Sequence, residues 1–225
     1  MTPAAELCNL LQELERKGTS VIDLVQGGQP VESWRLYPGE SGIFDRRTHY
    51  QFYYHSHGAD HEAGHFHTVR LFADHTVHLV AISMTPDGWP QALFTVNLWA
   101  IGDVHESAAN LRRYVRRFHL AEQVGPPVLV RFVNLVFRAF GTEIEQLQEE
   151  KIETLAAYRA AHPDHNIFED RSLEILSRAA IDPTGPRRLL SIRARPRTKP
   201  QCGDWGETTR RQGPCAWRHR IWRLR

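Results

Sequence analysis

The sequence contains few cysteines, and their positions exclude two classes of site. Its 225 residues include only three, Cys8, Cys202 and Cys215, which are widely separated and form no CxxC pair. That number is too small for a disulfide framework of the kind found in small secreted domains. Any metal site must therefore rely on histidine and carboxylate ligands and not on thiolates.

Long hydrophobic runs are also absent. No apolar stretch approaches the roughly 18 residues that a membrane span requires. The N-terminal segment MTPAAELCNLLQELERKG carries Glu6, Glu13 and Glu15 among its apolar residues, which favours an amphipathic helix over a signal peptide. Hydrophobic residues make up 41% of the chain and aromatic residues 10%, as is typical of soluble globular proteins. We expect a cytoplasmic protein with no membrane partner.

The net charge of +2 combines two regions of opposite sign. Residues 183–225 hold twelve Lys or Arg residues against Asp204 and Glu207, a net charge of +10, which leaves −8 for residues 1–182. Residues 183–225 are dense in Arg, Pro, Gly and Trp and show no hydrophobic periodicity, which is typical of disorder. We predict one domain over residues 1–182 and a disordered Arg-rich tail over 183–225. An out-of-frame C-terminus is an alternative explanation of the tail.

The hydrophobic pattern of residues 1–182 predicts an α+β fold. Leucines spaced i, i+3, i+4, i+7 predict a helix over residues 4–17, and glycines and prolines favour irregular structure over residues 26–48. Four segments of high strand propensity follow, joined by short loops, and predict an antiparallel four-stranded meander: HYQFYYHSH, GHFHTVRLF, HTVHLVAISMT and QALFTVNLWAI. Helices are predicted from Glu106, Pro127 and Thr142, with a last helical turn or two in IFEDRSLEILS. The meander should pack against these N-terminal and C-terminal helices.

Histidine is concentrated in the predicted strands. Eight of the 13 histidines lie between His49 and His78, five of them in the stretch HSHGADHEAGHFH. Imidazole is the commonest protein ligand for transition metals, and its charge changes near neutral pH. The cluster therefore indicates a metal site or a proton-handling site, and a structural hydrogen-bonded histidine network is the alternative.

Strand geometry predicts how these histidines are arranged. If residues 50–57 and 65–72 form a hairpin around Gly58–Gly64, a register that pairs His57 with His65 also pairs His55 with His67. Side chains alternate between faces along a strand, so all four imidazoles then lie on one face and can converge on one ion. The opposite face receives Phe52, Tyr54, Phe66 and Thr68. Tyr53 lies beside the histidines, where it contributes a wall or a hydroxyl.

We predict His55, His57, His65 and His67 as ligands of a divalent transition metal, with zinc, iron and nickel all open. Glu62 or Asp103 would supply a ligand or a general base, since iron sites often add one carboxylate to two histidines and catalytic zinc sites use three protein ligands. The segment HEAGH also matches the HExxH pattern of zinc peptidases. That chemistry requires a helix, whereas this segment leads directly into a predicted strand, which disfavours the peptidase interpretation.

Five segments, YYHSH, GHFHTV, HLVAIS, LFTVNLW and IFEDRSLE, resemble an uncharacterised bacterial family, a domain of unknown function. Its members carry YYHxH, EHGHFHTF, HLIAIS, LFTTNRWVTGE and VFEDRxLE in the same order, and the resemblance covers about residues 5 to 177. It brings no established activity. By motif position it implies Asn97 and Trp99 as further site residues, which we group with Tyr53 as cofactor-binding, beside the four histidines.

This chain departs from the family pattern in three places. Ala63 stands where the family has a histidine, a loss that His61 would replace. Leu98 replaces an arginine and Asp103 a glutamate, and the connection from Ala73 to Thr76 is shorter than in the family. These departures predict a changed anion contact or reduced activity.

Three functions follow from the sequence. The first is a metal-dependent protein, and in its fullest form an enzyme, acting on a small molecule by hydrolytic or oxidative chemistry. The second is a non-catalytic binding or structural module. The third is nucleic-acid binding through the tail, whose arginines and three tryptophans suit phosphate contacts and base stacking.

Overall fold

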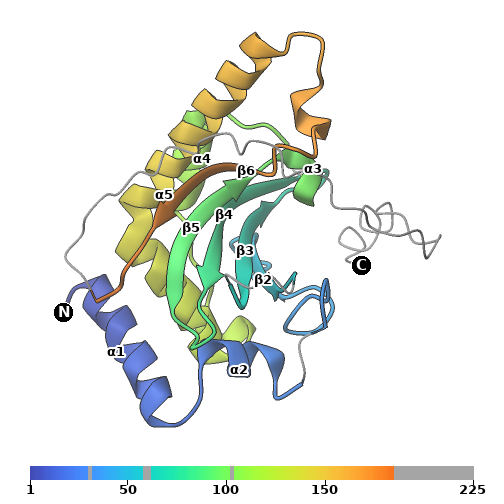
Figure 1. The fold of residues 1–225 in the computed structure, drawn as a ribbon. Coiled ribbons are helices and arrows are strands. Elements are labelled where there is room, and N and C mark those ends of the chain that lie inside the picture. Colours follow the sequence, from blue (N-terminus) through green and yellow to red (C-terminus); the bar gives the residue numbers. More distant parts are fainter. Residues whose placement is uncertain (30–31, 58–61, 102–103, 185–225) are drawn as a thin grey trace, which may run out of the picture. The chain divides into compact units, whose positions relative to one another are not determined.

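The computed structural model describes residues 1–29, 32–57, 62–101 and 104–184. Within these residues a six-stranded antiparallel sheet is accompanied by helices (Figure 1). The strands are β1 (Ile43–Phe44), β2 (Tyr50–His55), β3 (Gly64–Leu71), β4 (Thr76–Met84), β5 (Pro90–Val96) and β6 (Ile175–Ala180). The helices are α1 (Pro3–Arg16), α2 (Val21–Gln26), α3 (Leu98–Ile101), α4 (Ala108–Arg116) and α5 (Pro127–Ala161), with 3₁₀ turns η1 (Glu122–Val124) and η2 (Ile167–Glu169).

The strands lie in the sheet in the order in which they occur in the chain, which confirms the predicted antiparallel meander, but the prediction of four strands was wrong. Each missed strand lies at an edge. β1 pairs only Ile43 and Phe44 with β2, in a segment whose glycines and prolines favoured irregular structure. β6 pairs with β5 although α3, α4 and α5 separate them in the chain, and it occupies part of the segment predicted as a last helical turn. A strand such as β6, whose partner lies far away in the chain, is hard to predict from its own residues, because strand propensity depends on tertiary context.

The helix predictions require smaller corrections. The short helix α2, which was not predicted, follows α1, and Ser20 and Asp23 form a reciprocal capping box at its start. The two helices predicted from Pro127 and Thr142 form one helix, α5, which is kinked at Phe140 (φ −121°, ψ 24°). The fourth predicted strand ends at Val96, and its last residues form α3.

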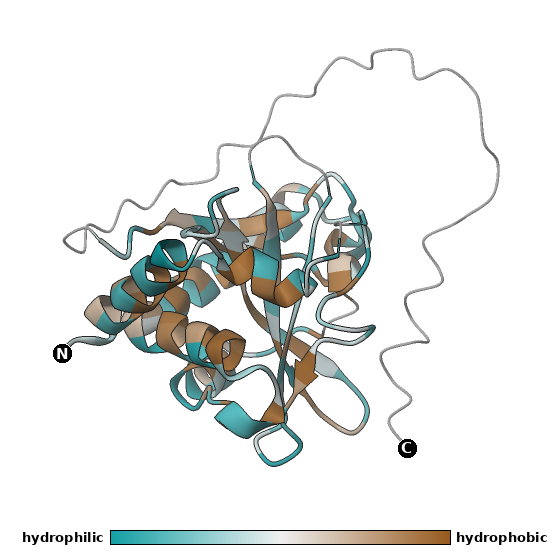
Figure 2. Ribbon diagram, turned by 90° about the horizontal axis from the view of Figure 1, so that it is seen from below, coloured by the Kyte–Doolittle hydropathy of each residue, from teal (hydrophilic) through white to brown (hydrophobic). Residues whose placement is uncertain are grey.

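One face of the sheet packs against α5, beside which α1 lies (Figure 1). The Phe66 and Phe132 rings lie 5.5 Å apart, and α1, α2 and α4 contribute further side chains to this core. The helices carry hydrophobic residues on one side and hydrophilic residues on the other (Figure 2), as amphipathic helices on a sheet do. None of the helices described is both long and apolar enough to cross a membrane.

The opposite face of the sheet carries a thinner apolar cover. Leu36 and Ile101 pack against Tyr53, Val69 and Leu71 on this side. Ala100 and Ile101 of α3 pack against a second group, Ala81, Phe94 and Val96. This second face also carries the histidines. The predicted disordered tail lies outside the described residues from residue 185 onward.

Candidate metal centre

The histidine hairpin forms with a register that differs from the predicted one by two residues. His55 pairs with His65, and Tyr53, not His55, pairs with His67. β2 ends at His55, so His57 lies just beyond the strand. The pairing of His57 with His65 was therefore wrong. Because a shift of two residues preserves the alternation of faces, the strand histidines still share one face.

The four residues predicted for the face opposite the histidines do lie there. Phe52, Tyr54 and Phe66 are completely buried and belong to the core that packs on the helices. Thr68 is also buried, and its hydroxyl donates a hydrogen bond of 2.7 Å to the carbonyl oxygen of Val80. The aromatic residues at alternate positions thus anchor both strands and direct the histidines toward the opposite face.

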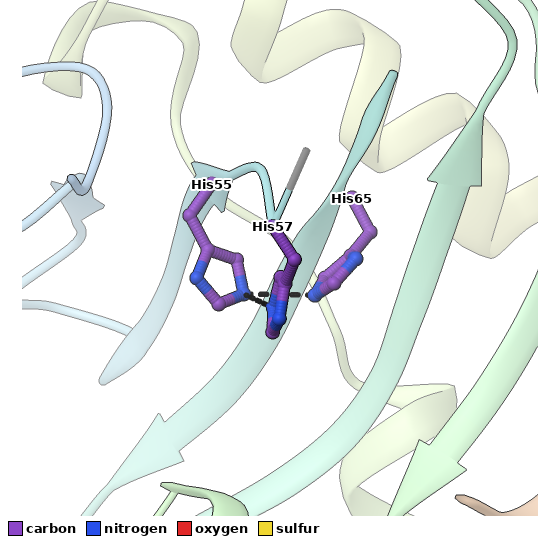
Figure 3. A group of neighbouring side chains, drawn as sticks. All are labelled: His55, His57 and His65. Carbon is purple, nitrogen blue, oxygen red and sulfur yellow. Dashed lines mark hydrogen bonds between the residues drawn. The ribbon is translucent and has the colours of Figure 1, made fainter. Parts of the chain in front are cut away.

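The imidazole Nε2 atoms converge. Those of His55 and His65 lie 2.8 Å apart, and the Nε2 atom of His67 lies 3.1 Å from each. His57 approaches more loosely, with its Nε2 atom 3.4 Å from that of His55 (Figure 3). His55, His57 and His65 each offer one nitrogen within 4.8 Å of the others, so this group could hold a metal ion.

Hydrogen bonds alone cannot satisfy the three closest nitrogens. A neutral imidazole nitrogen carries either a proton or a lone pair, so among three mutually adjacent nitrogens at least two are of the same kind. At least one of the three contacts then sets proton against proton or lone pair against lone pair. A metal ion accepts all three lone pairs. Bonds of 2.0–2.1 Å to one ion separate two ligand nitrogens by roughly 2.9 Å at octahedral angles and roughly 3.3 Å at tetrahedral angles. The observed distances of 2.8 and 3.1 Å lie close to the octahedral value.

Electrostatics favour the neutral form of three of these imidazoles. Burial, together with the nearby His65 and His57, lowers the pKa of His55 to about 2. Burial is also the main cause that lowers the pKa of His57 and holds the pKa of His67 well below its ordinary value. Neutral imidazole is the form that binds metal ions. These three histidines therefore need not lose protons at neutral pH before they bind.

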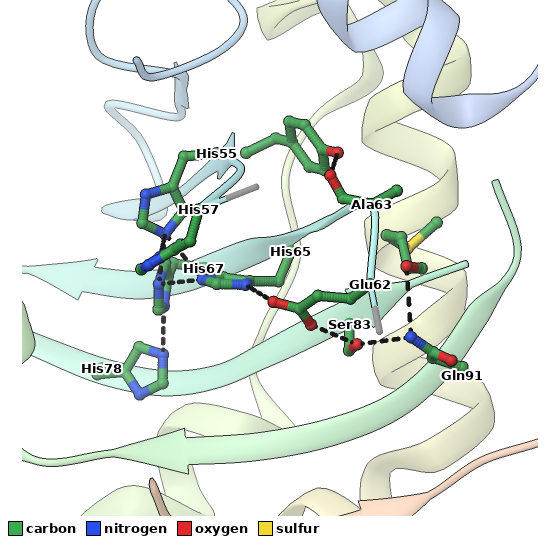
Figure 4. A network of polar contacts seen from close by, with 11 residues as sticks. His55, His57, Glu62, Ala63, His65, His67, His78, Ser83 and Gln91 are labelled. Carbon is green, nitrogen blue, oxygen red and sulfur yellow. Dashed lines mark hydrogen bonds and ion pairs between the residues drawn. The ribbon is translucent and has the colours of Figure 1, made fainter. Parts of the chain in front are cut away.

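Glu62 contacts the cluster through His65. Its Oε1 atom lies 2.8 Å from Nδ1 of His65, while its Oε2 atom accepts a hydrogen bond of 2.6 Å from the Ser83 hydroxyl. Gln91 donates in turn to Ser83 Oγ, at 3.1 Å (Figure 4). Since the carboxylate is an acceptor, it places the proton of neutral His65 on Nδ1 and leaves the Nε2 lone pair directed into the cluster.

His78 joins the cluster through an irregularity in β4. Thr68 pairs with Val80, but Val69 pairs with His78, so Leu79 is an extra residue at this point of β4. The extra residue reverses the alternation of faces. His78 is completely buried, and its Nε2 atom lies 3.1 Å from Nδ1 of His67. Burial and the nearby Lys151 hold the pKa of His78 well below its ordinary value.

Trp34 lies against the outer histidine. Its ring centroid is 4.1 Å from that of His57, its backbone N–H donates to the Ser56 carbonyl at 3.0 Å, and 56% of its surface is exposed. Its φ of 70° is strained for a bulky residue, and such strain concentrates at functional sites. Trp34 was not among the predicted site residues, because it lies in the segment where only irregular structure was predicted.

Gly64 explains how the two strands approach each other so closely at the site. Its φ is +145°, and a Cβ atom at this position would lie 2.5 Å from the His55 carbonyl oxygen and 2.5 Å from the Tyr54 hydroxyl. Any other residue would push β2 and β3 apart beside His65. Gly64 also begins β3, so HEAGH does not place His65 on a helix, and His61 lies outside the described residues.

The remaining predicted site residues differ in what they contact. Tyr53 is adjacent, with its ring centroid 5.3 Å from that of His67. Asn97 is completely buried, and its side-chain N–H groups donate to the Ile167 and Leu173 carbonyls, at 2.8 and 3.0 Å. Trp99 also donates to the Leu173 carbonyl, at 3.2 Å. Asp103 lies outside the described residues.

The family model described as "Domain of unknown function (DUF6969)" matches residues 1–181. The chain belongs to this family. This confirms the resemblance to a domain of unknown function and assigns no activity. No curated protein and no solved structure matches the chain.

Proposed function

We propose that the protein binds a divalent transition metal ion through Nε2 of His55, His65 and His67, with His57 as a looser fourth ligand. The observation that carries the proposal is the buried triangle of Nε2 atoms, 2.8 to 3.1 Å on each side, which hydrogen bonds alone leave unsatisfied. All-imidazole sites suit zinc, nickel, copper and iron, and disfavour magnesium and calcium.

Two contacts outside the triangle support this ligand set. Histidine ligands usually donate their second ring N–H to a carboxylate, a carbonyl or another acceptor, which fixes the ring orientation. Glu62 accepts such a hydrogen bond from Nδ1 of His65, and Nε2 of His78 is placed to accept one from Nδ1 of His67. We assign Glu62 to orienting His65, because its two carboxylate oxygens face His65 and Ser83.

The number of closely spaced ligands favours a catalytic metal site over a structural one. Structural zinc sites have four equivalent protein ligands, whereas catalytic sites use three and leave a position for water or substrate. Here three nitrogens form the tight group, and His57 is half-buried with a contact of 3.4 Å to one of them. An ion at this site would supply Lewis acidity toward a small molecule.

Elemental analysis of the full chain, purified without a histidine tag, tests the proposal. We expect about one transition-metal ion per chain, lost in the His65→Ala variant and retained in the His165→Ala variant, which changes an exposed histidine outside the cluster. Protein without stoichiometric metal that is equally stable with and without a chelator would overturn the proposal. The cluster would then be a hydrogen-bonded structural network.

A further inference from the structure

A row of side chains leads from the candidate metal centre to a cation at the edge of the sheet. In successive strand pairs, Tyr53 lies opposite His67, His67 opposite Ala81, Ala81 opposite Phe94, and Phe94 opposite Arg178. Directly paired residues point to the same face of a sheet. Arg178, on the last strand, therefore belongs to the same face as the histidines.

Phe94 connects this arginine to the site. Its ring centroid lies 5.2 Å from that of His65, and the Arg178 guanidinium carbon lies 5.4 Å from the same ring on Phe94. Arg178 is partly buried. Among the residues that the structure describes, it forms no ion pair or hydrogen bond through its guanidinium group, unlike Arg112 and Arg116, which pair with glutamates.

Charge balance points to the kind of ligand that this arrangement favours. A divalent ion held by neutral imidazoles keeps a charge of +2, and in the described part of the chain Glu62 is the only carboxylate that contacts the cluster. One positive charge stays uncompensated at the ion, and Arg178 adds another nearby. Buried charge is costly unless it is paired. A ligand with two negative groups compensates both.

We infer that the metal centre takes a small dicarboxylate, with one carboxylate on the ion and the other on Arg178. This inference rests on the proposed metal site. The strands β3 and β6 lie three strand spacings apart, roughly 14 Å. The Phe94 ring lies 5.2 Å from the His65 ring and 5.4 Å from the guanidinium carbon, which limits the distance between the latter two to at most about 11 Å. Subtracting about 2 Å for a metal–oxygen bond and about 2.8 Å for a guanidinium–carboxylate contact leaves at most roughly 6 Å between the two carboxylates. That separation fits four- or five-carbon dicarboxylates.

The test uses the full chain loaded with cobalt(II), whose visible absorption reports ligand binding to the ion. Succinate and acetate are titrated separately. We expect succinate to bind at least about tenfold more tightly than acetate, because a charge-assisted contact to Arg178 adds to the contact with the ion. Arg178→Gln should reduce succinate affinity to that of acetate and leave acetate affinity unchanged. Arg178→Lys, which keeps the charge without the planar fork, should retain part of the preference.

Arg113→Gln is the matched control, because its guanidinium also lies 5.4 Å from an aromatic ring, that of Tyr114, but on α4. It should bind succinate like the unmodified protein. Equal affinities of the unmodified protein for succinate and acetate, or an unchanged preference in Arg178→Gln, would overturn the inference while the metal site stands. If Arg178→Gln does not fold, Arg178→Lys decides the question. A preference for succinate over acetate as large in Arg178→Lys as in the unmodified protein would then overturn the inference. Cobalt that fails to bind overturns the metal site and this inference together.

Discussion

The Nδ1 atom of His65 lies 2.8 Å from Oε1 of Glu62, and this contact decides which nitrogen of the imidazole carries its proton. With the proton on Nδ1, the Nε2 lone pair points toward Nε2 of His55, 2.8 Å away. The Glu62 carboxylate, which lies outside the nitrogen triangle, thus leaves Nε2 of His65 able to bind an ion. The same arrangement explains why Glu62, which lies two residues before the start of β3, matters to a site built on strands.

Replacing Glu62 with glutamine should weaken metal binding without unfolding the protein. The amide retains the shape of the side chain but also presents an N–H donor, so the Nδ1–H tautomer of His65 loses its selective stabilisation. We expect metal affinity to fall about 10- to 100-fold, as for other residues that orient metal ligands. Competition with a chromophoric chelator measures this, with Asp74→Asn as control, since Asp74 pairs with His75 at the exposed surface. Equal affinities of Glu62→Gln and Asp74→Asn would contradict the assigned role.

His57 and His65 should differ in their contribution to metal affinity. Nε2 of buried His65 lies within 3.1 Å of two other nitrogens, whereas Nε2 of half-buried His57 lies 3.4 Å from that of His55. We expect His65→Ala to abolish stoichiometric binding and His57→Ala to retain it with reduced affinity, as measured by equilibrium dialysis. Indistinguishable losses would favour four equivalent ligands and a closed structural site.

Trp34 should control how quickly the ion exchanges. Its ring covers His57 at a centroid distance of 4.1 Å, and its strained backbone positions it there. We expect Trp34→Ala to accelerate metal transfer to a chelator severalfold, because His57 loses the ring that holds it, and Trp34→Phe to preserve most of the slow exchange. Stopped-flow measurements on both variants test this. Unchanged transfer in Trp34→Ala would show that the stacking has no effect on the site.

The metal-free protein should lose stability as the pH decreases below about 6.5. Folded His55 has a pKa of about 2, whereas the unfolded chain protonates this residue near its ordinary value of 6.5. The unfolded state therefore binds more protons between these two values, and the free energy of unfolding falls as the pH is lowered through that window. One such histidine contributes up to about 1.4 kcal/mol per pH unit.

Urea denaturation in the presence of a chelator, at pH 8, 6 and 5, measures this dependence. His55→Gln should show a shallower decrease in unfolding free energy than the unmodified protein, because one titrating group is gone. His165→Gln, which removes an exposed histidine, should follow the unmodified protein. The same slope in His55→Gln and His165→Gln would show that His55 is not the buried neutral group described here.

Asn97 should stabilise the fold and leave metal binding intact. Its side chain donates to the carbonyls of Ile167 and Leu173, which belong to the segment between α5 and β6. Asn97→Ala removes both donors, whereas the Leu173 carbonyl keeps the Trp99 indole N–H and the Ile167 carbonyl keeps the Asp170 backbone N–H. We expect a cost of about 1–3 kcal/mol in total. We expect a lower unfolding free energy with unchanged metal content, whereas Asn9→Ala, on the surface of α1, should change neither. Loss of metal from a folded Asn97→Ala protein would support the cofactor-binding role that the family resemblance implied.

The sequence by itself determined which face of each strand the histidines occupy. Alternation with period two is a local property of each strand, so Phe52 and Tyr54 had to lie on the opposite face of β2 from His55, and Phe66 on the opposite face of β3 from His65 and His67. The meander order of the four inner strands follows for a similar reason, since short loops between strands restrict them to antiparallel neighbours.

Tertiary structure decided the features that depend on distant contacts. The register that pairs His55 with His65 is set by how the strands pack, and the extra residue Leu79, which brings His78 to the cluster, leaves no mark in the sequence pattern. Trp34 and Arg178 reach the histidine face from an irregular segment and from a strand that pairs far along the chain. Local sequence fixes the direction of a side chain, whereas its neighbours are fixed only when the whole sheet has assembled.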